Sequence, residues 1–535
     1  MMRLSVLLAG AVAVTSVLAD GVVPPKAFRT TVEKPVSITT NAAGGVLVDF
    51  GRDAYGWLEF VTPQGGSYKL DIGEIVRDGA VWTPPVKSNI RAFRLQGLAE
   101  PGVFRVPVPL DLRNTRPGAL RVPPELGIVM PFRAVELAFG PFAGPTPGNI
   151  RRVTVQYGYD LSESTFRCSD PRLVRVWDYL KHAVAASTAF GLFIDGDRER
   201  LPYEGDALAT QLAAGAVFSD HEIARASFAY LMDHPTWPTE GKFCMIMMAW
   251  NEWRRTGKTD FLAKWYDRLV AEKLNGEKAR ADGLLVTNVK CDNPDWPRCE
   301  RDDYDMRPVS AQVNAYYCHA LALMAELATA LGKTGDAAAF AARAVQARAS
   351  FDAVFTDRAT GLYLDGEGSR HFSLHANALP LAFGLVPADR RARVADFVAS
   401  RSRRCSPYFM LYVLKGLCDC GREKDVFDAL LAEDDRSWLG MIGFGATMGM
   451  ESWNLKVKPN LDVNHSWCAV PLHFIAHWIL GVNPTGPGWP DLAVTPHLGP
   501  LAWAEGDVPT PRGIVHVRAE RLADGTVRTT VERKN

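Results

Sequence analysis

The stretch ALGKTGDAAAFAARAVQARASF, residues 330–351, decides the fold of the longest part of this chain. Gly332 is the residue type that ends helices, and Asp336 is a residue type that caps the start of the next one. After this turn, apolar residues from Phe340 to Phe351 recur at helical spacing. The stretch therefore predicts two antiparallel helices joined by a short connection.

The same pairing of a Gly with a following Asp occurs at two more places, Gly257 with Asp260 and Gly421 with Asp425. Such helical hairpins recur across Ala- and Leu-rich segments of residues 161–482, so they favour a closed toroid of paired helices. A solenoid of helical repeats gives a similar local pattern. The sequence has no fixed-period repeat that would favour the solenoid.

The segments on either side of the helical region have the alternating pattern of strands. Residues 20–160 are rich in Val, Gly, Pro and Thr, with period-two runs such as GSYKLDIGEIV at 66–76. Residues 483–535 contain the runs GIVHVRAERL and TVRTTVERK. We therefore expect an N-terminal β-sandwich before the helices and a small C-terminal β-sandwich after them.

The composition limits the classes of partner. The 535 residues have a formal net charge of zero, with 22% charged and 47% hydrophobic residues. A nucleic-acid partner would require a basic surplus, so none is expected, whereas an uncharged polymer suits this balance. No segment after the first twenty residues is an uninterrupted apolar run of membrane-spanning length, so no membrane partner is expected either.

The N-terminus reads MMRLSVLLAGAVAVTSVLAD, with one Arg, a short apolar run and a small-residue ending at Ala19. This pattern predicts a signal peptide at residues 1–19 and a secreted or periplasmic protein. In such a compartment Cys291 and Cys299, which flank a short loop, could form a disulfide. The nine Cys residues do not have zinc-site spacing and no EF-hand-like loop occurs, so no metal or cofactor is expected.

Five carboxylates crowd the stretch IDGDRERLPYEGDA, residues 194–207, with only two arginines among them. A mixed charge run is often just a solvated helix face or loop. Here apolar segments lie on both sides, at 183–194 and 207–218, so we expect the run at the mouth of a helix-packed core. Some of these carboxylates must then bind cations, protons or sugar hydroxyls.

Acidic and aromatic residues are also interleaved in three further segments: HPTWPTE at 234–240, CDNPDWPRCERDDYD at 291–305, and GFGATMGMESWN at 443–454 with DVNHSW after it. Each alone could be structural. Together they favour carbohydrate recognition, because aromatic rings stack on the apolar face of a pyranose while its hydroxyls need polar partners. Glycoside hydrolysis needs two carboxyl groups, one protonated and one ionised, and composition does not select the pair.

These residues resemble, in the same order along nearly the whole mature chain, the bacterial α-L-rhamnosidases of glycoside hydrolase family 78. VDFGRDAYGWLEF at 48–60 is similar to the family's DFG-x-x-x-x-GW strand pair, and FRCSDPRLVRVWDY at 166–179 to the segment leading into its helical barrel. The acid-rich loop at 194–207 resembles its D-x-P-x-R-[DE]-x-x-x-W-x-G-D motif. Residues 445–454, 464–467 and 488–506 match its Glu segment, its Asn-His segment and the run into its C-terminal domain.

The resemblance implies a mainly α protein in which an (α/α)6 barrel lies between two β domains. It also implies an inverting hydrolase that removes terminal α-L-rhamnosyl, or related deoxy or uronic, residues from oligo- or polysaccharides. Glu199 would be the general acid and Glu451 the base that activates water. The residues implied to bind the sugar are Asp195, Tyr203, Asp206, Trp237, Trp296, Trp453 and His465.

The acid loop departs from the family pattern. It is one residue shorter between its first Asp and the acid, lacks the Pro, and has Tyr where the family has Trp. Arg198 and Arg200 also flank Glu199, and a nearby cation disfavours the protonated form that a general acid needs. This electrostatic effect on Glu199 is reversed if both arginines point away from it, toward Asp197 or Glu204.

Two other functions stay open. A carbohydrate-binding protein on the same scaffold would keep the aromatic and acidic subsites but not the two carboxyl groups facing each other across one pocket, which lie about 6.5–9.5 Å apart in inverting enzymes. The same toroid could instead serve a lyase or a phosphorylase. A phosphorylase would need a phosphate pocket of Arg, His and Ser, and the sequence has no dense cluster of that kind.

Overall fold

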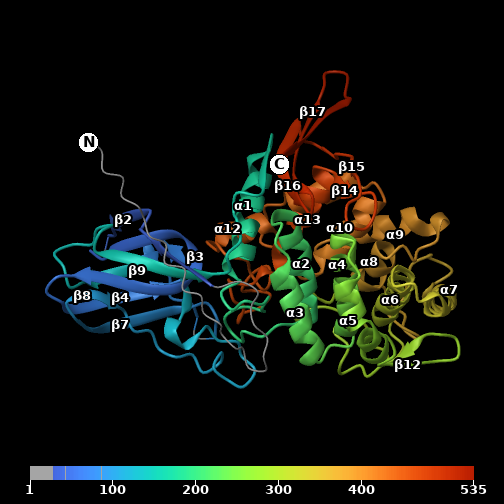
Figure 1. Ribbon diagram of the computed structural model, residues 1–535, viewed down its shortest axis with the longest axis horizontal. Helices are drawn as coiled ribbons and strands as arrows, with labels where there is room; N and C mark the ends of the chain where they lie inside the picture. Colours follow the sequence, from blue (N-terminus) through green and yellow to red (C-terminus); the bar gives the residue numbers. More distant parts are fainter. Residues whose placement is uncertain (1–27, 43, 86, 535) are drawn as a thin grey trace.

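The computed structural model describes residues 28–42, 44–85 and 87–534. The expected signal peptide, residues 1–19, lies outside the described residues. An N-terminal strand-rich part, a helical barrel and a C-terminal group of strands follow one another along the chain (Figure 1). The predicted fold class, mainly α with β domains at both ends, is therefore confirmed.

The N-terminal part is an eight-stranded antiparallel sheet with the strand path β1-β10-β3-β9-β4-β7, and β2 and β8 also pair with β3. The long strand β3 shifts register between Asp49 and Ala54, so it takes part in both halves of the sheet. A two-stranded hairpin, β5–β6, follows β4. The strands are β1 Arg29–Glu33, β2 Ser37–Thr40, β3 Val46–Thr62, β4 Gly66–Gly73, β5 Val76–Arg77, β6 Ala80–Val81, β7 Ala92–Ala99, β8 Gly102–Arg105, β9 Met130–Phe139 and β10 Ile150–Gln156.

Side chains of β3 pack into two different apolar cores. Leu58 and Phe60 lie in the sheet's own core with Phe132 of β9. Tyr55 belongs instead to the core of the barrel, where its ring meets that of Phe190 edge to face with centroids 5.1 Å apart. The sheet is therefore packed against the barrel, close to the loop that follows Phe190.

The helical region runs from residue 171 to residue 479, and its last turn, Ile475–Ile479, is a π-helix. Its helices are α1 Pro171–Ala186, α2 Glu204–Val217, α3 Glu222–Asp233, α4 Gly241–Thr256, α5 Asp260–Arg268, α6 Ala311–Ala330, α7 Thr334–Phe355, α8 Leu374–Ala382, α9 Ala388–Arg401, α10 Met410–Asp419, α11 Glu423–Leu430, α12 Trp438–Phe444 and α13 Pro471–Phe474. A small hairpin, β12 Lys278–Ala279 with β13 Leu285–Val286, lies between α5 and α6.

The helices alternate between an inner and an outer layer. The even-numbered helices from α2 to α10 contact one another in order, and each is followed by an odd-numbered helix that packs against it (Figure 1). All nine residues of α8 are buried, whereas α7 buries a single stripe that includes Phe340 and Phe351. The inner helix α8 is thus buried on all sides, whereas the outer helix α7 buries only one face.

The Gly residues predicted to end helices do so. Gly257, Gly332 and Gly421 have φ of 67°, 69° and 67°, and they follow α4, α6 and α10 closely. The prediction that Asp residues cap the next helices is wrong, because Asp260 is the first residue of α5 and Asp336 the third of α7. These carboxylates lie within the first helical turn, where they still interact favourably with the helix dipole.

The C-terminal strands form a four-stranded antiparallel sheet with the order β11-β16-β17-β18, and a separate pair, β14 with β15. Strand β11, Thr165–Cys168, precedes the barrel in sequence and was expected within it, yet it pairs with β16. The other strands are β14 Val482–Pro484, β15 Leu492–Val494, β16 Trp503–Thr510, β17 Gly513–Arg521 and β18 Val527–Lys534.

Cys291 and Cys299 are both free, so the disulfide that the sequence allows between them is not formed. The Cys299 thiol donates to the backbone oxygen of Val457 at 3.2 Å, while the Cys291 sulfur lies 3.5 Å from the side-chain nitrogen of Asn288. The two sulfur atoms therefore have different neighbours. Among the described residues, every helix is too short or too polar to span a bilayer.

Candidate active site

A cavity of about 260 Å³ lies at one end of the barrel. Its wall is built from the connections that lead into the inner helices α2, α4 and α6 and into α13, and these connections carry the four acidic and aromatic segments found in the sequence. Because successive helices run in opposite directions, the connections into inner helices all lie at the same end. Eight of the nine predicted site residues line this cavity: Asp195, Glu199, Tyr203, Asp206, Trp237, Trp296, Glu451 and His465.

The loop between α1 and α2 folds back on itself and carries the proposed acid. The backbone N–H of Asp195 donates to the oxygen of Leu201, and the N–H of Leu201 donates to Asp195 Oδ1. Gly196 has φ of 113°, and a Cβ there would lie 2.8 Å from Asp462 Oδ2. A glycine is thus required where the loop passes the segment that contains His465.

Arg198 lies between the two carboxyl groups proposed to carry the chemistry. Its Nη1 is 3.2 Å from Glu451 Oε1, and its Nε is 3.5 Å from Glu199 Oε1. Its Nη2 is 3.9 Å from Asp195 Oδ2. One guanidinium group therefore faces three carboxylates in a single cavity.

The two arginines that flank the proposed acid point in different directions. Arg200 points away, with Nη2 2.7 Å from Asp197 Oδ1 and 3.0 Å from the backbone oxygen of Val129. Arg198 instead faces the cavity beside Glu199. Of the two arginines that flank Glu199 in the sequence, only Arg198 therefore places its positive charge beside the Glu199 carboxyl group.

Glu199 has two further partners besides Arg198. The hydroxyl group of Tyr203 donates to Glu199 Oε2 at 2.9 Å, and Arg116 Nη2 lies 2.9 Å from the same oxygen. The Glu199 side chain is 21% exposed. Glu199 is thus held in place at the more open side of the cavity.

Glu451 is deeply buried, with its side chain only 1% exposed. Trp296 Nε1 donates to its Oε1 at 3.1 Å, and Lys458 Nζ lies 2.9 Å from its Oε2. With Arg198, two cations and an indole N–H surround this carboxylate. Such charge-assisted contacts fix the orientation of the carboxylate.

His465 links two buried carboxylates. Its Nε2 is 2.7 Å from Asp206 Oδ1, and its Nδ1 is 3.3 Å from Asp462 Oδ1. Burial alone would lower the pKa of His465, but the hydrogen bonds to Asp206 and Asp462 outweigh it and raise the pKa to about 10. The imidazole is therefore a cation near neutral pH, and it orients Asp206 in the cavity wall.

Asp195 is a buried acid of the same loop. Burial raises its pKa well above the ordinary value, although the charges of His465 and Arg198 act in the opposite direction. Its Oδ2 is buried and has no hydrogen-bond partner among the described residues. A carboxyl oxygen in this position is available to a hydroxyl group of a bound sugar.

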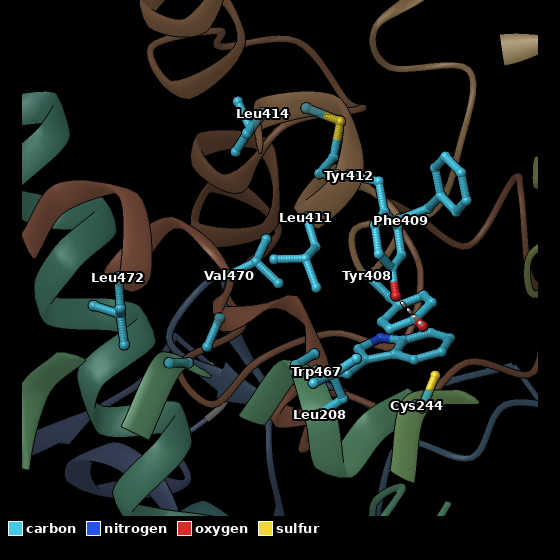
Figure 2. Close-up of a cluster of buried hydrophobic side chains, with 14 of the residues drawn as sticks. Leu208, Cys244, Tyr408, Phe409, Leu411, Tyr412, Leu414, Trp467, Val470 and Leu472 are labelled. Carbon is cyan, nitrogen blue, oxygen red and sulfur yellow. Dashed lines mark hydrogen bonds between the residues drawn. The ribbon is translucent and has the colours of Figure 1, made fainter. Parts of the chain in front are cut away.

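Aromatic side chains form the remaining walls. Trp237 and Trp296 are 49% and 37% exposed, as expected for rings that meet a ligand. Trp467 also lines the cavity, and its ring stacks on that of Tyr408 with centroids 5.3 Å apart, within a cluster of buried hydrophobic side chains (Figure 2). The cavity therefore has a rigid aromatic floor.

Trp453 does not line the cavity, so its predicted role in sugar binding is corrected. Its side chain is buried, with the ring edge to face against Trp438 at 5.3 Å. Its Nε1 donates to the backbone oxygen of Cys405 at 2.6 Å. The chain turns between Glu451 and Trp453, so only the first of the two side chains reaches the cavity.

Several residues of the site are not predicted from the sequence. Trp467 lies two residues after His465 in the quoted DVNHSW segment, so its neighbourhood was a usable signal. Lys458 and Arg116 had no comparable signal, because the first lies in an ordinary loop and the second in the N-terminal part. Within the residues that the structure describes, no group of three or more His, Cys, Asp or Glu side chains is placed to hold a metal ion.

Comparison with known protein families accounts for this arrangement. Residues 162–479 match the bacterial alpha-L-rhamnosidase 6 hairpin glycosidase domain, and residues 481–533 match the bacterial alpha-L-rhamnosidase C-terminal domain. The chain belongs to the bacterial α-L-rhamnosidase family. The family resemblance noted in the sequence is thereby confirmed, and the barrel is the six-hairpin glycosidase domain of this family.

Relatives of this α-L-rhamnosidase family member are distant in sequence. An α-L-rhamnosidase of Alteromonas sp. (strain LOR) is 27% identical over 239 residues, which are 42% of this chain and 25% of that protein. The structure of the family 78 rhamnosidase of Bacillus sp. GL1 has a TM-score of 0.74 at 22% identity, covering 96% of this chain and 54% of that one. The structure of the Streptomyces avermitilis α-L-rhamnosidase complexed with L-rhamnose also has a TM-score of 0.74, at 18% identity, covering 94% and 49%.

The chain matches only part of the length of these relatives. It spans a quarter of the length of the Alteromonas protein that it matches and about half the length of the two structures. The structural likeness shows a common fold.

Proposed function

We propose that this protein is an exported glycoside hydrolase that removes a terminal α-L-rhamnosyl residue, or a related deoxy or uronic sugar, from oligo- or polysaccharides. The observation that carries the proposal is the placement of Glu199 and Glu451 on one cavity with Arg198 between them. A cavity of about 260 Å³ suits one sugar residue at a chain end better than the middle of a polymer.

The difference in solvent exposure between the two carboxyl groups favours a different catalytic role for each. Glu199, at the more open side, is the general acid that donates its proton to the departing oxygen. Glu451, almost fully buried and surrounded by cations, is the base that takes a proton from water. The hydroxyl group of Tyr203 keeps the acid in position by its hydrogen bond to Glu199.

The position of Arg198 between the two carboxyl groups favours inversion at the anomeric carbon. In inverting glycosidases the two carboxyl groups are about 6.5–9.5 Å apart, which leaves room for a water molecule, whereas retaining enzymes hold them about 5–5.5 Å apart. Here the guanidinium group of Arg198 lies between Glu199 and Glu451. We infer that water attacks from the side of Glu451 while the leaving group departs on the side of Glu199.

The rest of the cavity provides contacts for the sugar. The unpartnered oxygen of Asp195 and the second oxygen of Asp206 face its hydroxyl groups. The exposed faces of Trp237 and Trp296 provide stacking surfaces for the apolar side of a pyranose ring. A deoxy sugar presents a larger apolar surface than a hexose, which suits these aromatic walls.

The test is hydrolysis of a panel of p-nitrophenyl α- and β-glycosides, with the α-L-rhamnoside first. Glu199→Gln and Glu451→Gln each remove one proton-transfer group while keeping size, so we expect kcat to fall about 10²–10⁴-fold in either variant. Glu433→Gln, on a 67% exposed side chain, is the matched control and should hydrolyse like wild type. NMR of the first sugar anomer released reads out inversion.

Each outcome bears on one part of the proposal. Activity within tenfold of wild type in Glu199→Gln or Glu451→Gln would remove that residue from its role. Release of the anomer with retained configuration would exclude the inverting course. Sugar binding by the wild-type protein without turnover of any substrate would favour a carbohydrate-binding protein on this scaffold.

Export is proposed from the sequence of residues 1–19, which has the pattern of a signal peptide. Expression of the full chain in a bacterium with a working secretion pathway should yield an exported protein whose first residue is Asp20. Mass spectrometry of the periplasmic fraction measures this, and an uncleaved cytoplasmic product would contradict it.

A further inference from the structure

A loop of the N-terminal part, residues 106–129 between β8 and β9, reaches the acid loop of the barrel. The backbone N–H of Leu120 donates to the oxygen of Arg200 at 2.9 Å. Asn114 Nδ2 donates to the backbone oxygen of Asp197 at 2.8 Å. These bonds hold the loop beside the proposed general acid.

Arg116 of this loop lies between two cavities. Its Nη2 is 2.9 Å from Glu199 Oε2 in the catalytic cavity. The same residue lines a second cavity of about 830 Å³, which also includes Tyr230 and His234 from the barrel. Since a general acid faces the oxygen of the leaving group, the second cavity begins on the leaving-group side of Glu199.

The charges of the second cavity fall into two sets. One set is balanced within itself by ion pairs and consists of Arg91, Asp111, Asp197 and Arg200. The other set consists of Arg116 and Arg121 with one acid, Glu125. In the described part of the chain, Arg121 forms no ion pair and Arg116 pairs only with Glu199, which lines the other cavity. Among the residues that line the second cavity itself, the second set therefore has two cations and one acid.

We propose that the second cavity is a leaving-group subsite for an acidic sugar, and that Arg116 binds the carboxylate of a hexuronic acid attached through the bond to be cleaved. This inference rests on the proposed hydrolase function and adds the chemistry of the leaving group. A guanidinium presents N–H groups in one plane that match the two oxygens of a carboxylate. The Arg116 side chain is 47% exposed, so a ligand reaches it without disturbing the core.

A carboxylate bound at Arg116 also changes the surroundings of Glu199. The proton of the acid passes to the glycosidic oxygen as the bond breaks, while water loses a proton to Glu451 and bonds to the anomeric carbon. Arg116 Nη2 contacts Glu199 Oε2 at 2.9 Å. A substrate carboxylate bound by the same guanidinium group releases Glu199 to face the glycosidic oxygen, so an acidic leaving group raises kcat as well as lowering KM.

The first measurement compares two disaccharides that differ only in one carboxyl group, α-L-rhamnosyl-glucuronic acid and its carboxyl-reduced glucose counterpart. Wild type should favour the acidic disaccharide about 10- to 100-fold in kcat/KM, the range for a charged hydrogen bond. Arg116→Met should bring this ratio close to one. The matched control is Arg113→Met in the same loop, because Arg113 is 44% exposed and pairs with Asp111.

The second measurement is calorimetric titration of glucuronate and of glucose into the same proteins. Binding of glucuronate that is at least tenfold weaker in Arg116→Met, and unchanged in Arg113→Met, would support the inference. Equal disaccharide ratios in wild type and Arg116→Met, or glucuronate affinity that does not depend on Arg116, would overturn it even if rhamnosides are hydrolysed. Binding that depends on Arg116 without hydrolysis of either disaccharide would overturn only the proposed hydrolase function.

Discussion

Glu74, at the end of β4, connects the N-terminal sheet to both loops that carry the proposed catalytic pair. Asn464 Nδ2 donates to Glu74 Oε1 at 2.7 Å, and the backbone N–H of Arg91 donates to Glu74 Oε2. Asn464 Oδ1 accepts from the backbone N–H of Asp197 at 2.6 Å. Through these bonds a single buried side chain holds the acid loop against the segment that contains His465.

We expect Glu74→Ala to lower the free energy of unfolding by about 2–6 kcal/mol. The change leaves two buried N–H donors without an acceptor, one on Asn464 and one on Arg91, and each costs about 1–3 kcal/mol. Glu74→Gln keeps one acceptor oxygen and should cost about half as much. Because Asn464 then no longer fixes the acid loop, kcat should fall in Glu74→Ala more than KM rises.

Urea unfolding followed by fluorescence, with kinetics on p-nitrophenyl rhamnoside, measures both effects. The matched control is Glu433→Ala, an exposed side chain that should change stability by less than about 0.5 kcal/mol. An unfolding free energy of Glu74→Ala within about 0.5 kcal/mol of wild type would refute the hydrogen-bond argument. Unchanged kcat in a destabilised Glu74→Ala would refute the positioning argument alone.

The pH dependence of the same variant follows from burial. Desolvation, together with the neighbouring charge of Asp53, raises the pKa of Glu74 well above its ordinary value of 4.5. The unfolded chain therefore releases this proton at lower pH than the folded one, so stability is fully present below about pH 4.5 and declines as pH rises above it. Wild type should lose more stability between pH 5 and pH 8 than Glu74→Gln, and equal slopes would contradict this.

Three further predictions concern single residues. Trp453→Phe removes the indole N–H that donates to the buried backbone oxygen of Cys405, so it should lower the free energy of unfolding by about 1–3 kcal/mol. The kcat/KM per folded molecule should stay unchanged. A selective loss of kcat would instead show that Trp453 belongs to the site. Because the pKa of His465 is raised to about 10, its contribution to stability is full below about pH 6.5 and is lost as pH rises through 10, so thermal unfolding of His465→Gln should depend less on pH between 7 and 10 than wild type. Thermal unfolding of a double variant, Cys291→Ser with Cys299→Ser, should match wild type with and without reductant, and a reductant-sensitive wild type would reveal a disulfide.

The parts of the fold that depend on local conformation could be predicted from the sequence. Gly332 ends its helix because it alone tolerates the positive φ that a turn requires, and that signal is visible in a single residue. The helix start at Thr334 was placed too late, at Asp336, because the turn after the glycine takes fewer residues than a capping Asp would need. Strand β11 was missed because its partner β16 lies more than three hundred residues later.

The site residues that lie in recognisable sequence motifs could be predicted from the sequence. Glu199 and Glu451 are recognisable from family motifs, and the barrel brings their loops together. Trp453 was misplaced because two residues of separation in an irregular segment do not determine which way a side chain points. Arg116 has no sequence signal at all, since its importance arises only from the docking of one domain on another.

Strand β11 also bears on how this protein can be divided. The two family matches separate the chain near residue 480, yet Thr165–Cys168 lies on the barrel side of that boundary and forms an edge of the sheet on the other side. A barrel expressed without its C-terminal strands would expose the hydrogen-bonding edge of β11, and the C-terminal strands alone would lack a neighbour for β16. The barrel and the C-terminal sheet therefore form a single structural unit. An exchange of domains between members of the family should transfer residues 165–534 together.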